Sequence, residues 1–176
     1  MNYLPQIGVS VTRKESWDKV TGRAKYNGDN ISPDTLYGKV LTSTQAHALI
    51  KYIDRSEAEK SKGGRAVITG DFLPVLTGSV ISDRPPLARD RVRYFGEPVA
   101  VVIADSPQEA AYGVALIQVE YESLPVVNSI GDAIREDPVL IHEKLGLYHY
   151  PNEEANPQVN SNIAGLTKIR KGDIDK

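Results

Sequence analysis

The stretch that decides the fold runs from residue 90 to residue 127 and reads DRVRYFGEPVAVVIADSPQEAAYGVALIQVEYESLPVV. Its segment 99–104 is a continuous apolar run of strand length, which is typical of a strand covered on both faces. Segment 117–121 instead alternates apolar and polar residues, which indicates a strand with one buried face. The stretch therefore predicts two strands with different surroundings.

A helix is expected between these two strands. Ser106 is a good N-cap, Pro107 suits the first helical position, and Glu109 stands where a capping-box carboxylate is found. These signals, followed by a face of small residues, predict a helix over 106–115. A strand, a helix and a second strand in this order predict parallel strands joined by a right-handed crossover.

The preceding half of the chain follows a similar plan. Asp54 and Glu57 repeat the pattern of a cap followed by a glutamate, and Gly63-Gly64 suits a helix end. The resulting fold class is α+β, with short helices packed on a mixed sheet that contains strand–helix–strand units. The expected strands are 36–42, 48–54, 65–69, 91–95, 98–104, 117–122 and 164–169, and the expected helices are 55–61, 106–115 and 129–134.

Composition limits the classes of function. The 176 residues carry 21 basic and 23 acidic side chains, so the net charge of -2 gives no electrostatic case for nucleic acid or an anionic membrane. No apolar window is long enough for a membrane span, and the N-terminus lacks a signal-peptide core, so we expect a cytoplasmic protein. Without cysteine, the chain has no disulfide, thiol nucleophile or cysteine-ligated iron–sulfur cluster.

Catalytic motifs give two weak leads. His142-Glu143 begins like a zinc-protease helix, but Gly146 occupies the place of the second histidine. Glu120 and Glu122 share the polar face of an expected strand and could form an acid/base pair in a small enzyme. A solvated strand face is the favoured interpretation of that pair.

Two further features lie just before the expected strand 98–104. Arg89, Arg91 and Arg93 form a basic cluster beside Asp90, which we interpret as a set of salt bridges rather than an anion site. The segment 75–86 has no periodicity and contains three glycine or proline residues. It is expected to be a long loop, and long loops in compact domains are often functional.

Five stretches together carry a resemblance to a known family. They are KVTGRAKY at 19–26, TSTQAHALI at 42–50, VRYFGEPVAVVIAD at 92–105, EYESLPVV at 120–127 and RKGD at 170–173. In this order and spacing they resemble the N-terminal α/β hammerhead domain of the molybdenum-binding catalytic subunit of the xanthine dehydrogenase/aldehyde oxidase family. No single stretch is specific, but the ordered set is.

The resemblance implies an oxidoreductase of which this chain is one part. Family members oxidise purines, aldehydes or N-heterocycles with a molybdopterin cofactor, and electrons leave through 2Fe-2S clusters, usually to FAD, on partner domains or subunits. The cofactor loops and catalytic residues lie downstream of the hammerhead region. The resemblance therefore implies no catalytic, cofactor-binding or metal residue in this fragment. The implied partners are the molybdopterin-binding domains of the same chain and the iron–sulfur and FAD units of an oligomeric enzyme.

The expected organisation has three parts. Residues 1–17 form a lead-in segment, residues 18–135 form the hammerhead domain, and residues 136–176 form an extended tail toward a missing molybdopterin-binding domain. The chain would then be an excised fragment or a truncated gene product, inactive alone, with a scaffold role.

In larger relatives the loop at this position lines the substrate funnel, so Val80 and Ile81 would be the apolar lining here. The alternative is a free-standing module that binds a small molecule or a protein without molybdenum chemistry. That alternative predicts a closed C-terminus and a well-formed pocket.

Overall fold

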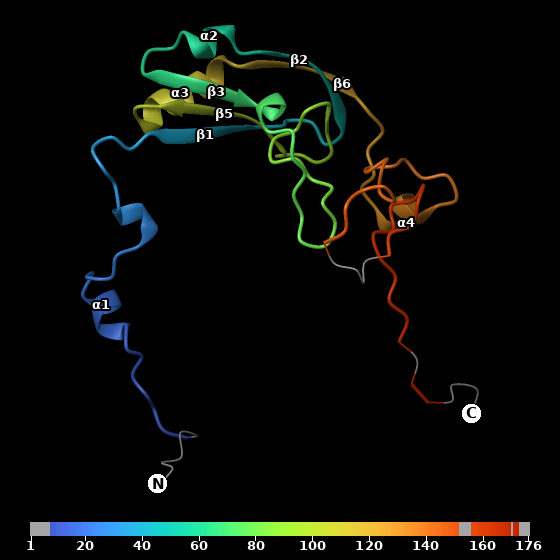
Figure 1. Cartoon of the computed structure of the whole chain (residues 1–176), viewed down its shortest axis with the longest axis horizontal. Helices are drawn as coiled ribbons and strands as arrows, with labels where there is room; N and C mark the ends of the chain where they lie inside the picture. Colours follow the sequence, from blue (N-terminus) through green and yellow to red (C-terminus); the bar gives the residue numbers. More distant parts are fainter. Residues whose placement is uncertain (1–7, 152–155, 170, 173–176) are drawn as a thin grey trace. The chain divides into compact units, whose positions relative to one another are not determined.

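The computed structural model describes residues 8–151, 156–169 and 171–172 (Figure 1). The chain divides into two compact units, Met1–Thr35 and Leu36–Lys176. In the first unit, helix α1 spans Ser16–Val20 and the 3-10 helix η1 spans Asn27–Asp29, and neither contains a buried residue. The division into 1–17, 18–135 and 136–176 stays a prediction.

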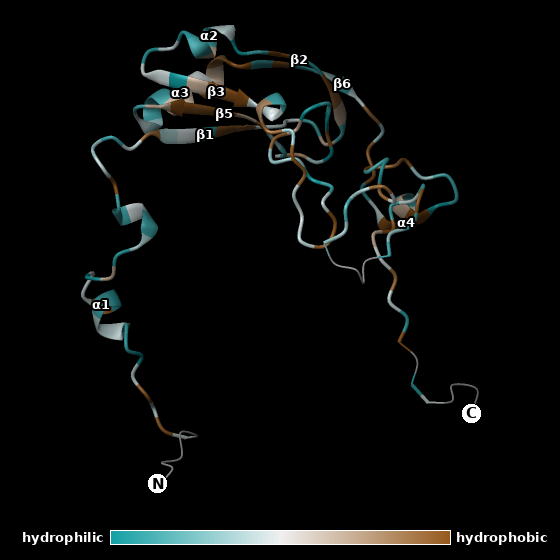
Figure 2. Ribbon diagram, viewed as in Figure 1, coloured by the Kyte–Doolittle hydropathy of each residue, from teal (hydrophilic) through white to brown (hydrophobic). Residues whose placement is uncertain are grey.

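The second unit contains two three-stranded antiparallel sheets. In the first sheet β5 lies between β1 and β3, and in the second β2 lies between β4 and β6. The strands are β1 Tyr37–Thr42, β2 Ala48–Asp54, β3 Gly64–Thr69, β4 Arg91–Val92, β5 Pro98–Ala104 and β6 Gln118–Ser123. Figure 2 shows that the central strand β5 is hydrophobic along most of its length.

Three short helices lie between these strands, and a fourth, α4, follows β6. They are α2 Ser56–Glu59, the 3-10 helix η2 Gly70–Phe72, α3 Pro107–Leu116 and α4 Ile130–Ile134. Ser106 caps α3 as expected, because its hydroxyl oxygen accepts a hydrogen bond from the Glu109 N–H at 3.2 Å. The hydroxyl also donates to the Glu109 carboxylate at 2.8 Å. Gly63, between α2 and β3, has a φ of 75°, a value that favours glycine.

The hydrophobic core lies between the sheets and the helices. One cluster joins Ala100 and Val102 of β5 to Ala58, Val67 and Ile117, and the half-buried Val114 of α3 packs against it. A second cluster is made of Ala48, Ala88, Val92 and Val99. β5 contributes to both clusters, but its two faces differ in burial: Ala100, Val102 and Ala104 are buried, whereas Val101 and Ile103 on the other face are half-buried. The expected coverage of both faces is therefore met fully on one face and only in part on the other.

The α+β class is confirmed, and the strands expected at 48–54 and 98–104 have the observed bounds. The predicted parallel crossover is wrong. β5 and β6 lie in different sheets, and each pairs with antiparallel neighbours. The crossover rule holds only for strands of one sheet, and α3 carries the chain from one sheet to the other.

Two other expected strands differ from the structure. The strand expected at 91–95 ends at Val92, because a turn with Gly96 at a φ of 88° precedes β5. In the described residues 156–169 no strand is present, so the expectation at 164–169 is wrong. Two residues of the stretch 170–173 lie outside the described residues.

Candidate functional site

An exposed apolar loop follows β3. Every residue from Asp71 to Val80 is exposed. Its large apolar side chains are Phe72, Leu73, Val75, Leu76 and Val80, with exposed fractions between 40% and 63%. We call residues 72–80 the apolar loop. A run of exposed apolar side chains of this length is typical of a surface that contacts a partner.

The end of this loop is a closed turn. Thr77 and Arg84 pair as an antiparallel bridge, with N–H to carbonyl distances of 2.8 and 3.2 Å. Gly78 has a φ of 147°, and a Cβ atom there would lie 1.8 Å from the carbonyl oxygen of Ile81. The turn from Thr77 to Arg84 therefore needs glycine at this position.

The two residues expected to line a substrate funnel lie on this turn. Val80 is 48% exposed, whereas Ile81 is 9% exposed and packs inward. Both line a cavity of about 580 Å³, together with Ala164 and Gly165. The turn thus presents the Val80 side chain outward and uses Ile81 for its own packing.

The segment 138–150 packs against the last part of this turn. We call it the crossing segment. The Ser82 N–H donates to the carbonyl oxygen of His149 at 2.9 Å, and His142 Nδ1 lies 3.4 Å from the Asp83 carboxylate. Leu145 is its buried apolar anchor, at 5% exposure. The tail expected to be extended is therefore attached to the body of the second unit at these points.

Arg93 and Glu97 form a buried pair beneath the crossing segment. Glu97 is 2% exposed, and its carboxylate accepts a hydrogen bond from the Arg93 N–H. The Arg93 Nη1 lies 3.9 Å from Glu97 Oε1. Burial raises the pKa of Glu97 above its usual value, against the opposing effects of the Arg93 N–H and the Arg93 charge. Sequence reasoning missed Glu97, although a charged residue directly before a buried strand was the available signal.

The arginine cluster is a set of salt bridges, as the sequence indicated. Arg91 Nη1 lies 2.9 Å from Glu143, and Arg89 Nε lies 4.0 Å from Asp71. With the Arg93–Glu97 pair, each arginine of the cluster has a carboxylate neighbour.

The two glutamates of β6 lie on a solvated face. Lys51 Nζ donates to Glu122 at 2.9 Å across the strands, and both side chains are about half exposed. Glu120 is exposed as well. This placement agrees with the solvated-face interpretation and not with an acid/base pair in a cavity.

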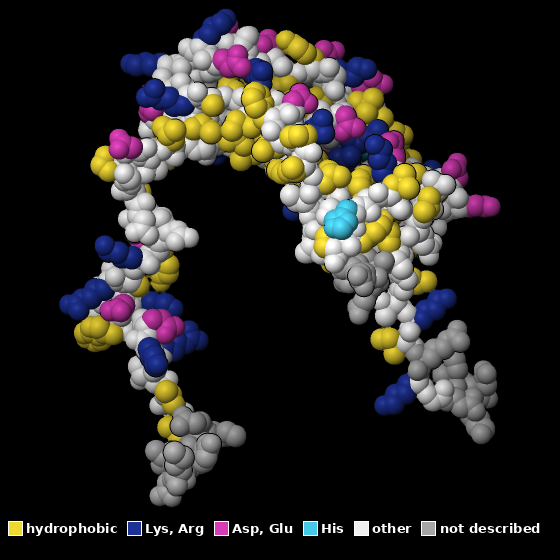
Figure 3. All heavy atoms as spheres, in the orientation of Figure 1, with side chains coloured by type: hydrophobic (Ala, Val, Ile, Leu, Met, Phe, Trp, Pro, Cys, Tyr) yellow, Lys and Arg dark blue, Asp and Glu magenta, His cyan; other side chains and the backbone are white. Residues whose placement is uncertain are grey.

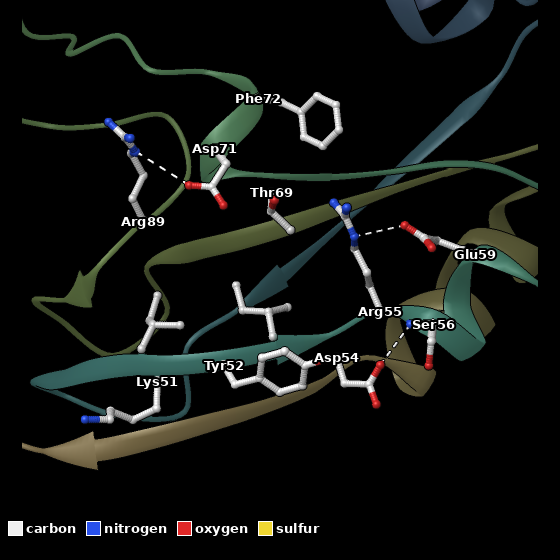
Figure 4. Close-up of a pocket in the computed structure, with 12 residues that line it drawn as sticks. Lys51, Tyr52, Asp54, Arg55, Ser56, Glu59, Thr69, Asp71, Phe72 and Arg89 are labelled. Atoms are coloured by element: carbon white, nitrogen blue, oxygen red, sulfur yellow. Dashed lines mark hydrogen bonds and ion pairs between the residues drawn. The ribbon is translucent and has the colours of Figure 1, made fainter.

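Another pocket lies where β2, α2 and η2 meet, with a volume of about 570 Å³ (Figure 4). The Arg55 guanidinium lies over the Phe72 ring, 5.6 Å from its centre, and its Nε lies 2.9 Å from Glu59. Asp54 accepts from the Ser56 N–H at 3.0 Å, and this hydrogen bond lowers the pKa of Asp54. Because the two arginines of this pocket, Arg55 and Arg89, are each paired with a carboxylate that also lines it, they offer little attraction for an anionic ligand.

Metal-binding clusters and membrane-spanning helices are both absent from the described part of the chain. Among residues 8–151, 156–169 and 171–172, no group of three or more histidine, aspartate or glutamate side chains is arranged to hold a metal ion. No helix within these ranges is long and apolar enough to cross a membrane.

The environment of His142 predicts a pH dependence of stability. Burial lowers the pKa of His142 below its usual 6.5; the nearby Asp83 carboxylate opposes this shift and the Arg93 charge adds to it. Tyr148 packs edge-on to the ring, 6.2 Å between centroids. Since the folded pKa is the lower one, the unfolded chain takes up the proton first. The contribution of neutral His142 is therefore full above pH 6.5 and is lost as the pH falls through the folded pKa.

We expect the free energy of unfolding of the His142→Gln variant to fall less between pH 7 and pH 5 than that of the unchanged chain. Denaturant unfolding at several pH values measures this difference. His149→Gln is the matched control, because the His149 side chain is exposed and only its backbone carbonyl serves the attachment. If the free energy of unfolding fell equally with pH in the His142→Gln variant and the unchanged chain, His142 would not be the source of the pH dependence.

A comparison with protein-family models shows to which family this domain belongs. Residues 21–125, more than half of the chain, match the family model described as aldehyde oxidase and xanthine dehydrogenase, a/b hammerhead domain. The chain belongs to this family. The match covers both sheets, α2, α3 and the apolar loop, so the fold and the candidate surface are those of a hammerhead domain.

Curated relatives agree with this assignment. The hammerhead chain is 42% identical over 142 residues to a probable xanthine dehydrogenase subunit of Bacillus subtilis, covering 80% of this chain and 19% of the relative. It is 33% identical over 150 residues to the nicotinate dehydrogenase large molybdopterin subunit of Eubacterium barkeri, covering 84% and 35%. The chain thus spans between about a fifth and about a third of these relatives.

Solved structures show the same fold. The aldehyde oxidoreductase of Desulfovibrio gigas matches with a TM-score of 0.67 and 31% identity, over 74% of the hammerhead chain and 16% of the oxidoreductase. The quinoline 2-oxidoreductase of Pseudomonas putida matches with a TM-score of 0.66 and 37% identity, over 72% and 17%. These comparisons do not favour a free-standing binding module.

Proposed function

We propose that this chain is the scaffold domain of a molybdenum-containing hydroxylase or dehydrogenase of the xanthine dehydrogenase type. The observation that carries the proposal is the exposed apolar loop on a domain whose relatives are much longer oxidoreductases. The domain packs against the molybdopterin-binding part of the enzyme and shapes its substrate entrance. Oxidation of a purine, an aldehyde or an N-heterocycle belongs to the whole enzyme, and the fragment alone is inactive.

The docking surface consists of the apolar loop and the turn before β5. Phe95 in this turn is 72% exposed and Tyr94 is 44% exposed. Figure 3 shows further hydrophobic side chains along the sheet edge that β1 forms, where Val40 is 41% exposed. Contact with a second apolar surface would remove these side chains from water, at roughly 25 cal/mol per Å² of apolar area buried.

The substrate entrance lies at the turn from Thr77 to Arg84. The Val80 side chain forms the apolar lining, and Ile81, buried in this chain, supports it from below the surface. An apolar lining at an entrance favours weakly polar substrates over strongly hydrated ones.

Cofactors and redox partners belong to the remaining parts of the enzyme. Molybdopterin is bound by the domains of the same subunit on which this domain packs. The 2Fe-2S clusters and FAD are carried by partner domains or subunits of an oligomeric complex in the cytoplasm. This chain contributes surface and positioning and binds none of these groups itself.

A chimera tests the docking surface. This chain replaces the matching 142-residue segment of the Bacillus subtilis relative, and amide hydrogen exchange is compared between the chimera and the chain alone. We expect the amides of residues 72–80 and of the turn at 94–95 to exchange at least about tenfold more slowly in the chimera. Exchange in α3, which lies outside the proposed surface, serves as the internal control. Equal exchange of the apolar loop in both proteins would contradict the proposal.

A further inference from the structure

The crossing segment contacts the last part of the turn from Thr77 to Arg84. We propose that Arg93 is a positioning residue that holds the crossing segment in place and, through it, this turn. Glu97 in turn places Arg93. The inference rests on the proposed function, because this turn carries Val80 and Ile81 at the substrate entrance. Three contacts in series carry the argument.

The first contact attaches the crossing segment to the domain. The Arg93 Nε donates to the carbonyl oxygen of Ile141 at 3.2 Å. The Arg93 side chain is only 12% exposed, so water competes little for this hydrogen bond. A second backbone atom of the same residue is also engaged, because the Ile141 N–H donates to the Asn162 side chain at 3.0 Å. Ile141 is therefore held from two directions.

The second contact connects the crossing segment to the turn. The next residue, His142, lies 3.4 Å from the Asp83 carboxylate, and the carbonyl oxygen of His149 accepts from the Ser82 N–H at 2.9 Å. Ser82 and Asp83 directly follow Ile81. A shift of Ile141 would therefore move the atoms that hold the last part of the turn.

The third contact explains why Arg93 itself is fixed. Its backbone N–H donates to the Glu97 carboxylate, which is buried. Glu97 belongs to a turn tied to the end of β1, because Ser43 exchanges backbone hydrogen bonds with Glu97 and Gly96 at 2.8 and 2.9 Å. The chain of contacts thus runs from the first sheet, through Glu97 and Arg93, to the crossing segment.

An arginine is needed at this position. Its Nε donates a hydrogen bond to the Ile141 carbonyl, while its Nη1 lies 3.9 Å from the Glu97 carboxylate. One rigid planar group therefore makes both contacts. A lysine carries the same charge on a single flexible ammonium group and cannot keep both geometries. Arg93→Lys therefore changes positioning while it preserves the charge beside Glu97 and His142.

Amide hydrogen exchange on this chain tests the proposal. We expect the Ser82 amide to exchange at least about tenfold faster in the Arg93→Lys variant, which corresponds to the loss of one well-formed hydrogen bond. The amides of Val102 and Ile68 in the first sheet should keep their rates. Arg65→Lys is the matched control, because Arg65 makes a two-atom contact with Asp105, outside the crossing segment and the turn.

Two outcomes would overturn the proposal. One is an unchanged Ser82 rate in Arg93→Lys, and the other is a rise shared equally by Ser82 and the sheet amides, which would indicate general destabilisation. If Arg93→Lys does not fold, Asp83→Ala provides the second variant. It removes the carboxylate that lies 3.4 Å from His142 and should accelerate Ser82 while Ile141 stays protected. An unchanged Ser82 rate in this variant overturns the proposal, and so does an acceleration of Ile141. This readout needs no partner, so it succeeds or fails independently of docking in the chimera.

Discussion

Replacing Glu97 by alanine should lower the free energy of unfolding by about 3 kcal/mol, the range found when one partner of a buried ion pair is removed. The Glu97 side chain is 2% exposed and that of Arg93 12%. The alanine variant leaves a guanidinium without its carboxylate and a backbone N–H without its acceptor. It also leaves a cavity where the side chain was.

Denaturant unfolding at pH 7 measures this loss, and Glu97→Gln is the matched control. Glutamine keeps the shape and a carbonyl oxygen that can accept from the Arg93 N–H, so it should cost clearly less than alanine. The pKa of Glu97 is raised in the folded chain. The part of its contribution that depends on protonation is therefore full below its usual pKa of 4.5 and is lost as the pH rises through the folded value, whereas the contacts with Arg93 that the alanine variant removes are still present at pH 7. Glu97→Gln should lack this decline, and an alanine variant as stable as the unchanged chain would contradict the buried-pair account.

Placing a charge on the docking surface should have the largest effect on assembly. In the chimera, Phe95→Asp and Leu76→Asp should each reduce the molybdenum-loaded fraction roughly tenfold or more, since each removes a large apolar contact and buries a carboxylate in its place. The stability of the isolated chain should change little, because both side chains are exposed here.

Tyr112→Asp is the control for this prediction. Tyr112 lies on α3, is 60% exposed, and stands outside the apolar loop and the turn at 94–95. Molybdenum content per polypeptide, measured on the purified chimera, compares the three variants. Equal loss in all three would show that a general surface change, and not this docking surface, limits assembly.

Local features of the fold could be predicted from the sequence because the residues that determine them are neighbours in the chain. The apolar run at 98–104 and the Ser106 cap depend on adjacent residues, and the structure confirms both. The parallel crossover failed because sheet membership depends on which strands meet β5 in space. That choice is made by β1 and β3, which lie far from β6 in the sequence.

The candidate site was less predictable than the fold. The segment 75–86 was expected to be a functional loop, and Val80 and Ile81 were placed on it through the family resemblance. Their different exposure depends on the Thr77–Arg84 bridge and on Gly78, which no periodicity indicates. Glu97 was missed because its role depends on Arg93, whose side chain contacts the crossing segment more than 40 residues away in the chain.

The molybdenum content of the unsubstituted chimera tests the central claim most directly. If this chain is the scaffold domain of a molybdopterin enzyme, the Bacillus subtilis relative carrying it in place of its own segment should purify with molybdenum per polypeptide close to that of the unchanged relative. A chimera that folds and is soluble but contains no molybdenum, beside a fully loaded unchanged relative, would contradict the scaffold assignment.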